Sequence, residues 1–281
     1  MTTAINLSDL SAPQLLENIM AEEIFQEMLA DFKAKDPSYS AIVESDPVYK
    51  ILQVAAYREY ILRVRVNDAV RGVLLAYAIG TDLEHLAAQK NIKRQEGETD
   101  AALRLRVQLA PESYSVAGPS GAYAFHSLSA HADIKDVKAI SPSPGLVKNV
   151  ILAKSGNGTA SQEILGAVYA ALTDENIRPL TDQVTVASAE IVPYQIDAEL
   201  RFYDGPDSAV VTAEAQAQIE AYAQDQHRIG RDITLSAIYA ALHRPGVQNV
   251  VITSPADDII ISDEQAAYCT QITLSDGGLY A

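Results

Sequence analysis

Residues 47–79 form the stretch PVYKILQVAAYREYILRVRVNDAVRGVLLAYAI, in which Pro47 is the one proline and Gly72 the one glycine. Asp46 precedes the proline, and a capping residue followed by proline is favoured at the start of a helix. Gly80 follows the stretch and favours a helix end. We therefore predict one helix over residues 47–79, about 50 Å long at 1.5 Å per residue.

Apolar residues on this predicted helix repeat with alternating spacings of three and four, as in a coiled coil. The positions of this predicted seam are Leu52, Ala55, Glu59, Leu62, Val66, Ala69, Val73 and Ala76, and only Glu59 breaks the apolar pattern. A second apolar set, Val54, Tyr57, Ile61 and Val64, lies on another side. Two interpretations stay open: a central helix surrounded by its own domain, or a helix that bundles with other chains.

The rest of the first 110 residues is also predicted to be helical. Apolar residues at helical spacing indicate a helix from about Ser11 to Asp36, ended by Pro37. Two shorter helices are predicted over residues 83–90 and 103–109. We therefore expect residues 1–111 to be a helical, bundle-forming domain.

After Pro111 the pattern changes to strands mixed with helices. The predicted strands are 134–140, 147–153, 184–189, 196–203, 247–253, 258–262 and 268–274. The predicted helices are 122–130, which Ser120 would cap, and 161–172, 209–228 and 235–242. Such a mixture, with mainly hairpin-linked strands, indicates an α+β fold and not a doubly wound parallel sheet. We predict two small α/β modules with mixed or antiparallel sheets, a middle one over 112–190 and a C-terminal one over 191–281.

Two segments of this half, residues 122–142 and 235–255, share one order of features. Each has a helix, a histidine, an apolar strand and then Ser-Pro. The proline has no N–H to donate and should end the pairing of each strand. Duplication of a helix–turn–strand unit and chance similarity are both open explanations.

Composition excludes several classes of partner. The chain has 37 acidic and 21 basic residues and a net charge of −16, whereas nucleic acids and anionic membranes need a cationic surface. The N-terminus resembles no secretory signal, and no run of 18 apolar residues could span a bilayer. Cys269 is the only cysteine, so no intrachain disulfide can form. We expect a soluble protein that folds in a reducing cytoplasm.

The residues that carry chemistry form no recognisable catalytic or metal-binding pattern. None of the five histidines lies in HExxH or in a helical pair spaced by three or four. Cys269 lacks a flanking base, and the loop Ser155–Thr159 lacks the lysine of a phosphate-binding loop. The acidic cluster at 257–264 lacks the ligand spacing of an EF-hand. No catalytic, cofactor or metal site is predicted, although a hydrolase with a site assembled from distant residues stays an open alternative.

Several short stretches, in order over nearly the whole chain, together resemble one family. They are LQVAAYRE at 52–59, RVRVNDA at 63–69, AYAIGTDL at 76–83, LAPE at 109–112, SVAGPSGAY at 115–123, RPLTD at 178–182, VTV at 184–186, QHRIGR at 226–231 and AAYC at 266–269. Jointly these motifs are similar to the baseplate J-like proteins of contractile-tailed phages.

This resemblance implies a structural role in the tail baseplate of a virion assembled in the bacterial host cytoplasm. Members of the family form wedges that ring a central hub, and their C-terminal modules pair between neighbours. A second copy and a smaller wedge protein would join through a bundle of N-terminal helices, on which a lysozyme-fold sheath-initiator protein docks. The resemblance makes 47–79 the bundle helix and implies no enzyme activity and no cofactor.

The residues that we expect to contact other chains lie on this helix. They are Leu52, Ala55, Arg58, Glu59, Leu62, Arg65, Val66, Ala69 and Val73. The alternative function is a stand-alone homo-oligomeric binding or scaffold protein unrelated to tails.

Overall fold

A computed structural model describes residues 5–38, 42–115, 117–205 and 207–279. The chain divides into two compact units. The helical unit consists of Ala4–Arg94 and Glu98–Gln108, and the sheet unit consists mainly of Leu109–Ala281.

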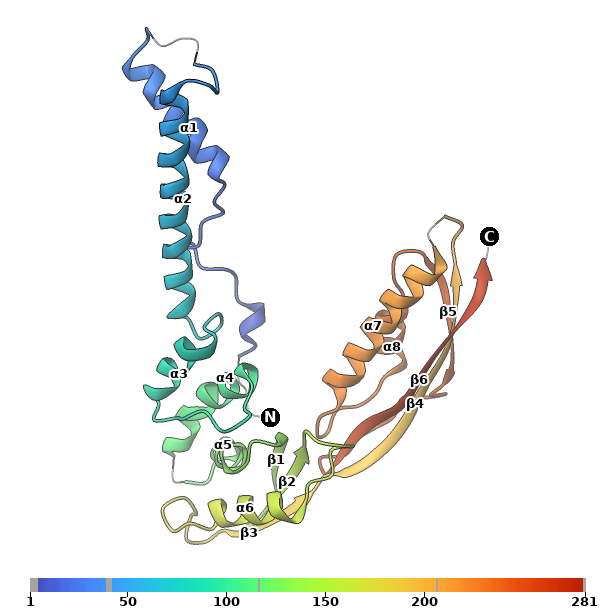
Figure 1. The fold of residues 1–281 in the computed structure, drawn as a ribbon. Coiled ribbons are helices and arrows are strands. Elements are labelled where there is room, and N and C mark those ends of the chain that lie inside the picture. The colour runs from blue at the N-terminus through green and yellow to red at the C-terminus, as the bar shows by residue number, and fades with distance from the viewer. Residues whose placement is uncertain (1–4, 39–41, 116, 206, 280–281) are drawn as a thin grey trace. The chain divides into compact units, whose positions relative to one another are not determined.

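The helical unit is built around two helices that lie side by side, α1 (Ala21–Lys35) and α2 (Pro47–Gly72) (Figure 1). Ile24 and Phe25 of α1 are buried against Ala56 of α2, and this small cluster joins the two helices. A short 3-10 helix (Leu7–Asp9) precedes them, and α3 (Gly80–Ala88) and α4 (Asp100–Leu109) follow.

The two long helices of this unit are shorter than the sequence predicts. The predicted helix 47–79 ends at Gly72, after 26 residues, and residues 73–77 form turns. Arg104 of α4 stabilises these turns, because its guanidinium donates to the carbonyl oxygens of Leu75 at 2.8 Å and Ala78 at 2.6 Å. The predicted helix from Ser11 is also wrong over its first ten residues, since α1 begins at Ala21.

A buried ion pair joins α4 to the residues that precede it. The Arg106 guanidinium donates to both carboxylate oxygens of Glu98, at 2.7 and 2.8 Å, and also to the carbonyl oxygen of Lys93. The side chains of Arg106 and Glu98 are only 7% and 2% exposed. Burying such a pair costs desolvation energy, and the two hydrogen bonds of its bidentate geometry offset that cost.

The first half of the sheet unit is a three-stranded sheet under two helices. Its elements are a 3-10 helix (Ala110–Tyr114), α5 (Ser120–Ala130), β1 (Ile134–Ser143), β2 (Leu146–Ala153), α6 (Gln162–Leu172) and β3 (Gln183–Ser188). The central strand β2 is antiparallel to β1 and parallel to β3. Tyr123, Ile151 and Val168 are among the residues that fill the core between helices and sheet.

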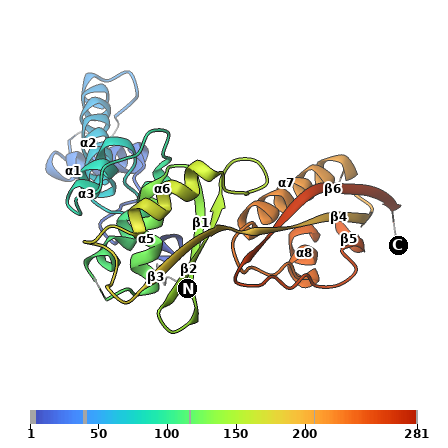
Figure 2. The ribbon, with the colours of Figure 1, turned by 90° about the horizontal axis from the view of Figure 1, so that it is seen from below.

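The second half repeats this sheet pattern with different connections. It contains β4 (Glu190–Phe202), α7 (Ser208–Gln226), α8 (Leu235–Leu242), β5 (Val247–Ser254) and β6 (Gln265–Leu279). The central strand β4 is antiparallel to β5 and parallel to β6. Both helices cover one face of the sheet (Figure 2), where Leu200, Ile219 and Ile238 are fully buried.

The two sheets meet where the chain passes from β3 through buried Ala189 into β4. A small apolar cluster, which includes Leu152 and Ile229, fills this junction. The Asp136 carboxylate accepts from the backbone N–H of Ile229 at 3.0 Å, and burial raises the pKa of this carboxyl group.

The α+β fold predicted from the sequence is confirmed, with mixed sheets in the second half. Some details are wrong. The predicted strand 258–262 is only an isolated bridge between Ile233 and Ile259, and Ser120 is the first residue of α5 and not its cap. Among the described strands, only β1 and β2 form a hairpin: β4 and β5 are antiparallel but are joined through α7 and α8, and the parallel strands need longer crossovers. Both sheets belong to one compact unit, so the division at residues 190 and 191 stays a prediction.

The two similar segments do form the same local structure. In each, a helix (α5 or α8) is followed by a strand (β1 or β5) that pairs antiparallel with the central strand of its sheet. Regular pairing of β1 is interrupted between Ile140 and Ser143, beside Pro142, and β5 ends just before Pro255. The expected end of pairing is therefore seen at Pro255 but not at Pro142, because Ser143 still pairs with Leu146. The duplication itself stays a prediction.

Candidate interaction surface

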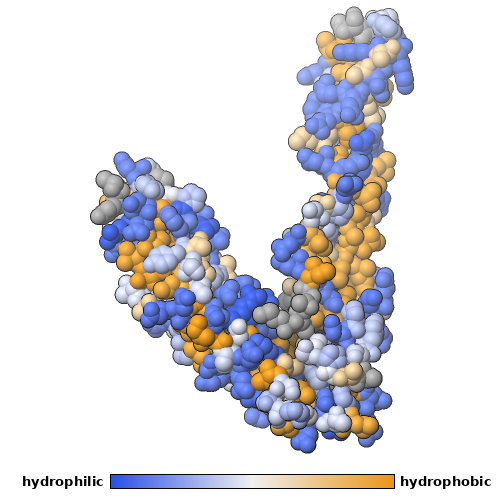
Figure 3. All heavy atoms as spheres, turned by 180° about the vertical axis from the view of Figure 1, so that it is seen from behind, coloured by the Kyte–Doolittle hydropathy of each residue, from blue (hydrophilic) through white to orange (hydrophobic). Residues whose placement is uncertain are grey.

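The most unusual surface of the helical unit is an exposed apolar face of α2. Leu62 and Val66 of this helix are 62% and 59% exposed, and Val73, directly after it, is 69% exposed. Space filling shows apolar residues gathered along this helix (Figure 3). An isolated apolar side chain on a surface is ordinary, but a continuous row of them marks a contact site.

The predicted seam divides into two parts in the structure. Leu52 and Ala55 are half-buried, and Leu52 packs against the cluster that joins α1 and α2. Glu59 is also half-buried and pairs with Arg63 at 2.5 Å. Ala76, in the turns after α2, is half-buried. The other four positions are exposed, and we name them the exposed seam: Leu62, Val66, Ala69 and Val73.

An extended segment borders the exposed seam and makes it concave. The Asn67 side chain, which is buried, donates to the carbonyl oxygen of Glu17 at 2.9 Å and accepts from its N–H at 3.2 Å. This pair of hydrogen bonds replaces the backbone partners that a helix would give Glu17. Leu15, Leu62, Val66 and Ala69 then line a shallow depression. The sequence analysis did not predict a role for Asn67. The signal that could have indicated one is its position as a polar residue among the apolar residues of the helix.

We expect Asn67→Ala to release this segment without unfolding α2. The loss of two hydrogen bonds between partly buried groups should cost roughly 1–3 kcal/mol locally. Hydrogen exchange should show faster exchange at residues 14–18 and unchanged exchange at 51–60 of α2. Unchanged exchange at Glu17 would show that other contacts hold the segment.

Two arginines of α2 are also exposed. Arg58 and Arg65 are seven residues apart, two helical turns, and so lie close to one face. Within the described part of the chain, no carboxylate forms an ion pair with either of them, whereas Arg63 pairs with two carboxylates and Arg71 with one. In a chain with a surplus of acidic residues, two such cations on one helix are available to a partner.

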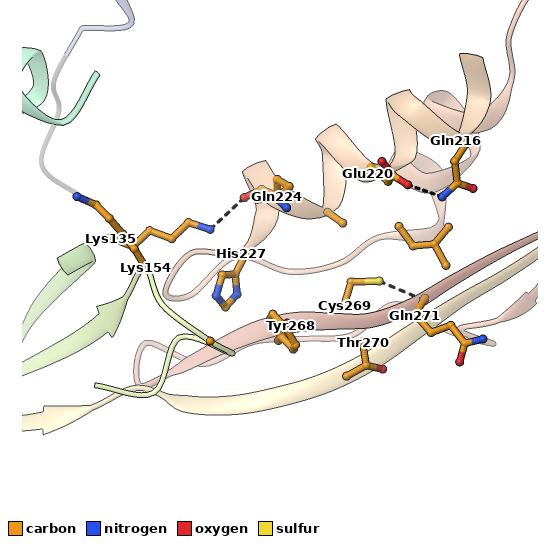
Figure 4. Close-up of a pocket in the computed structure, with 13 residues that line it drawn as sticks. Lys135, Lys154, Gln216, Glu220, Gln224, His227, Tyr268, Cys269, Thr270 and Gln271 are labelled. Atoms are coloured by element: carbon orange, nitrogen blue, oxygen red, sulfur yellow. Dashed lines mark hydrogen bonds between the residues drawn. The ribbon is translucent and has the colours of Figure 1, made fainter. Parts of the chain in front are cut away.

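The sheet unit contains a polar groove lined by a histidine, His227, and the cysteine, Cys269 (Figure 4). His227 donates from Nδ1 to the carbonyl oxygen of Ala267 at 2.7 Å, and burial lowers the pKa of its imidazole. Burial raises the pKa of the Cys269 thiol, which keeps it protonated and a poor nucleophile. In the part of the chain that the structure describes, the Cys269 thiol donates to the carbonyl oxygen of Gln271 and forms no hydrogen bond with a histidine or carboxylate. Among the described residues, no group of three His, Cys, Asp or Glu side chains could hold a metal ion.

An exposed apolar helix face of this extent is typical of a protein that assembles with other chains. Comparison with known sequences identifies which assembly family. Three regions match the baseplate J-like family models: residues 44–98 the N-terminal domain, 115–188 the central domain and 194–275 the C-terminal domain. Baseplate protein J of Escherichia phage P2 is 42% identical over 296 residues, which is 98% of each chain. The chain belongs to the baseplate J-like family and is a structural protein of a phage baseplate, not an enzyme.

A chain of the cryo-EM structure of the anti-feeding prophage (AFP) baseplate, 6-fold symmetrised, is similar over 63% of this chain and 43% of its own length. The TM-score is 0.40 and the sequence identity 16%. Separately, none of the helices that the structure describes is long and apolar enough to cross a membrane.

Proposed function

We propose that this chain is a wedge subunit of a contractile-tail baseplate and that α2 is its bundle helix. Two copies would join one smaller wedge protein through their α2 helices, and a lysozyme-fold sheath-initiator protein would dock on that bundle. The wedges would ring the central hub of a particle assembled in the bacterial host cytoplasm.

The observation that carries this proposal is the exposed seam. Leu62, Val66 and Val73 each leave more than half of their surface in water. Burying such side chains contributes on the order of 1 kcal/mol or more apiece. A bundle of helices from other chains would cover them, whereas neither α1 nor the segment that Asn67 holds covers them in the single chain.

The test is to express the chain with and without the smaller wedge protein and to measure the mass of each species by light scattering. We expect a complex of two copies of this chain with one copy of the smaller protein. A homo-oligomer that forms alone and takes up no smaller protein would instead support the second candidate, a stand-alone scaffold.

Charge at the arginines should govern how quickly the complex forms. Reversing both, in Arg58→Glu/Arg65→Glu, should slow association about tenfold at low salt and weaken its salt dependence, because complementary charges steer encounter. Stopped-flow association at several ionic strengths measures this. Lys33→Glu/Lys35→Glu on α1 changes the net charge equally and should slow association far less. If both double variants slow association equally, Arg58 and Arg65 act only through the net charge of the chain and not through a specific contact.

A further inference from the structure

The groove of the sheet unit lies along one edge of β6. Five successive residues of this strand, Tyr268–Ile272, line it, together with residues of α7. Alternate side chains of a strand point to opposite faces, so successive residues can share a groove only where it follows the strand edge. The groove therefore exposes the strand's main chain as well as its side chains.

The outer edge of β6 has no partner strand over most of its length. The inner edge pairs with β4 from Gln265 to Leu279. On the outer edge, Ile229 forms a bridge to Ala266, and the N–H of Gly230 donates to the carbonyl oxygen of Gln265. No described strand pairs with the outer edge beyond that point.

Features that normally block such an edge are missing from β6. An exposed edge is usually protected by lysine, proline or a short strand. The exposed residues of β6 are mostly neutral, with Thr270, Gln271 and Thr273 at the groove end and Asp276 the one charged residue of the strand. An edge of this kind is suited to accept an added strand from another chain.

The charge at the groove shows which kind of strand fits. Lys135 and Lys154 lie together at one end, and Glu220 lies toward the other, where it accepts from Gln216 (Figure 4). In the described structure both ammonium groups donate to carbonyl oxygens, Lys135 to Gln224 and Lys154 to Ala132, and neither forms an ion pair with a carboxylate, although Asp136 and Asp225 attract Lys135 from farther away. Burial, and then repulsion from Arg228, lowers the pKa of Lys135. The whole chain carries a net charge of −16, so two lysines without an ion pair at one end of the groove differ from the acidic surface elsewhere.

From these observations we infer that the groove between α7 and β6 binds an extended, acidic segment of a partner chain as an added strand on β6. Main-chain hydrogen bonds to the outer edge give the strand its register. A carboxylate of the bound segment lies against Lys135 and Lys154. The apolar floor of Ala223, Cys269 and Ile272 receives alternate side chains.

The inference is tested with two fluorescein-labelled peptides of alternating valine and threonine, one with a glutamate at each end and the other with a lysine at each end. We expect the full-length chain to bind the glutamate peptide at least tenfold more tightly in fluorescence anisotropy, because the groove offers it two cations, Lys135 and Lys154, and offers the lysine peptide one carboxylate, Glu220. Higher salt should reduce this difference. Equal binding of both peptides, or binding of neither, would overturn the inference.

Variants locate the charge effect. Lys135→Gln/Lys154→Gln should weaken binding of the glutamate peptide about five- to tenfold, since two ion pairs are lost. Lys33→Gln/Lys35→Gln makes the same change in net charge on the helical unit and should leave binding unchanged. Equal weakening by both pairs would show that the peptide responds to overall charge, which contradicts a site at the groove.

Hydrogen exchange on the unchanged chain locates the strand and does not depend on how a variant folds. The glutamate peptide should protect backbone amides within residues 268–279 and leave β5 unchanged. Protection elsewhere would place the peptide at another site and overturn the inference. If the chain alone dimerises and the dimer already protects these amides, then the occupant is a second copy and the proposed acidic partner is wrong.

Discussion

Val66→Asp is expected to abolish assembly with the partner chains. In the proposed bundle this position is desolvated, and an unpaired carboxylate there should cost several kcal/mol, enough to lower affinity by a factor of a thousand or more. Ala69→Asp, one turn further along the exposed seam, should act in the same way. Both side chains are exposed in the single chain, so its own folding should be unaffected.

The control for this prediction is Val210→Asp on α7, because Val210 is an exposed helical valine of the sheet unit, at 66% exposure. Co-purification with the smaller wedge protein measures assembly, and circular dichroism measures folding. Val66→Asp and Ala69→Asp should lose the partner and keep their fold, while Val210→Asp should keep both. Normal assembly of the two seam variants would mean that the contact surface lies elsewhere on the chain.

Arg106→Met is expected to have the largest effect on stability. It leaves the Glu98 carboxylate buried without its guanidinium partner, and removing one member of a buried pair typically costs roughly 3–5 kcal/mol. The free energy of unfolding of the helical unit should fall by this amount. In urea, followed by circular dichroism, its transition should move to lower concentration by roughly 2 M.

The matched control is Arg71→Met, which removes an arginine from an exposed pair. Arg71 lies 3.3 Å from Asp68, and both side chains are more than half exposed, so the cost should stay below about 1 kcal/mol. Glu98→Leu/Arg106→Met removes both buried charges and should recover part of the lost stability. Equal destabilisation by Arg71→Met and Arg106→Met would contradict the importance of the buried pair.

Much of the sheet unit could be predicted from the sequence because its signals are local. The predicted bounds of the helix 235–242 agree with α8 at both ends, since its apolar periodicity is strong and turn residues flank it. Errors occurred where a distant side chain decides the local structure. Arg104 binds carbonyl oxygens 26 and 29 residues earlier, in the turns that follow α2, and Asn67 holds Glu17, 50 residues before it. The local periodicity of a sequence cannot indicate contacts between residues so far apart in the chain.

The interaction surface was predictable in part for the same reason. Heptad spacing identified the positions of the exposed seam, but it could not show that α1 covers Leu52 and leaves Leu62 open. The contacts predicted for Leu52, Ala55, Arg58, Glu59 and the other residues of α2 stay predictions. Lys135 and Lys154 had no signal at all, since only the folded sheet unit brings them together.

The central claim is that the exposed seam of α2 is covered by another chain in the assembled baseplate. The most direct measurement places a photo-crosslinking amino acid at Val66 in the native particle and identifies the products by mass spectrometry. The account predicts cross-links from Val66 to the α2 helix of a second copy or to the smaller wedge protein. Cross-links only within the same chain, in particles that assemble normally, would contradict it.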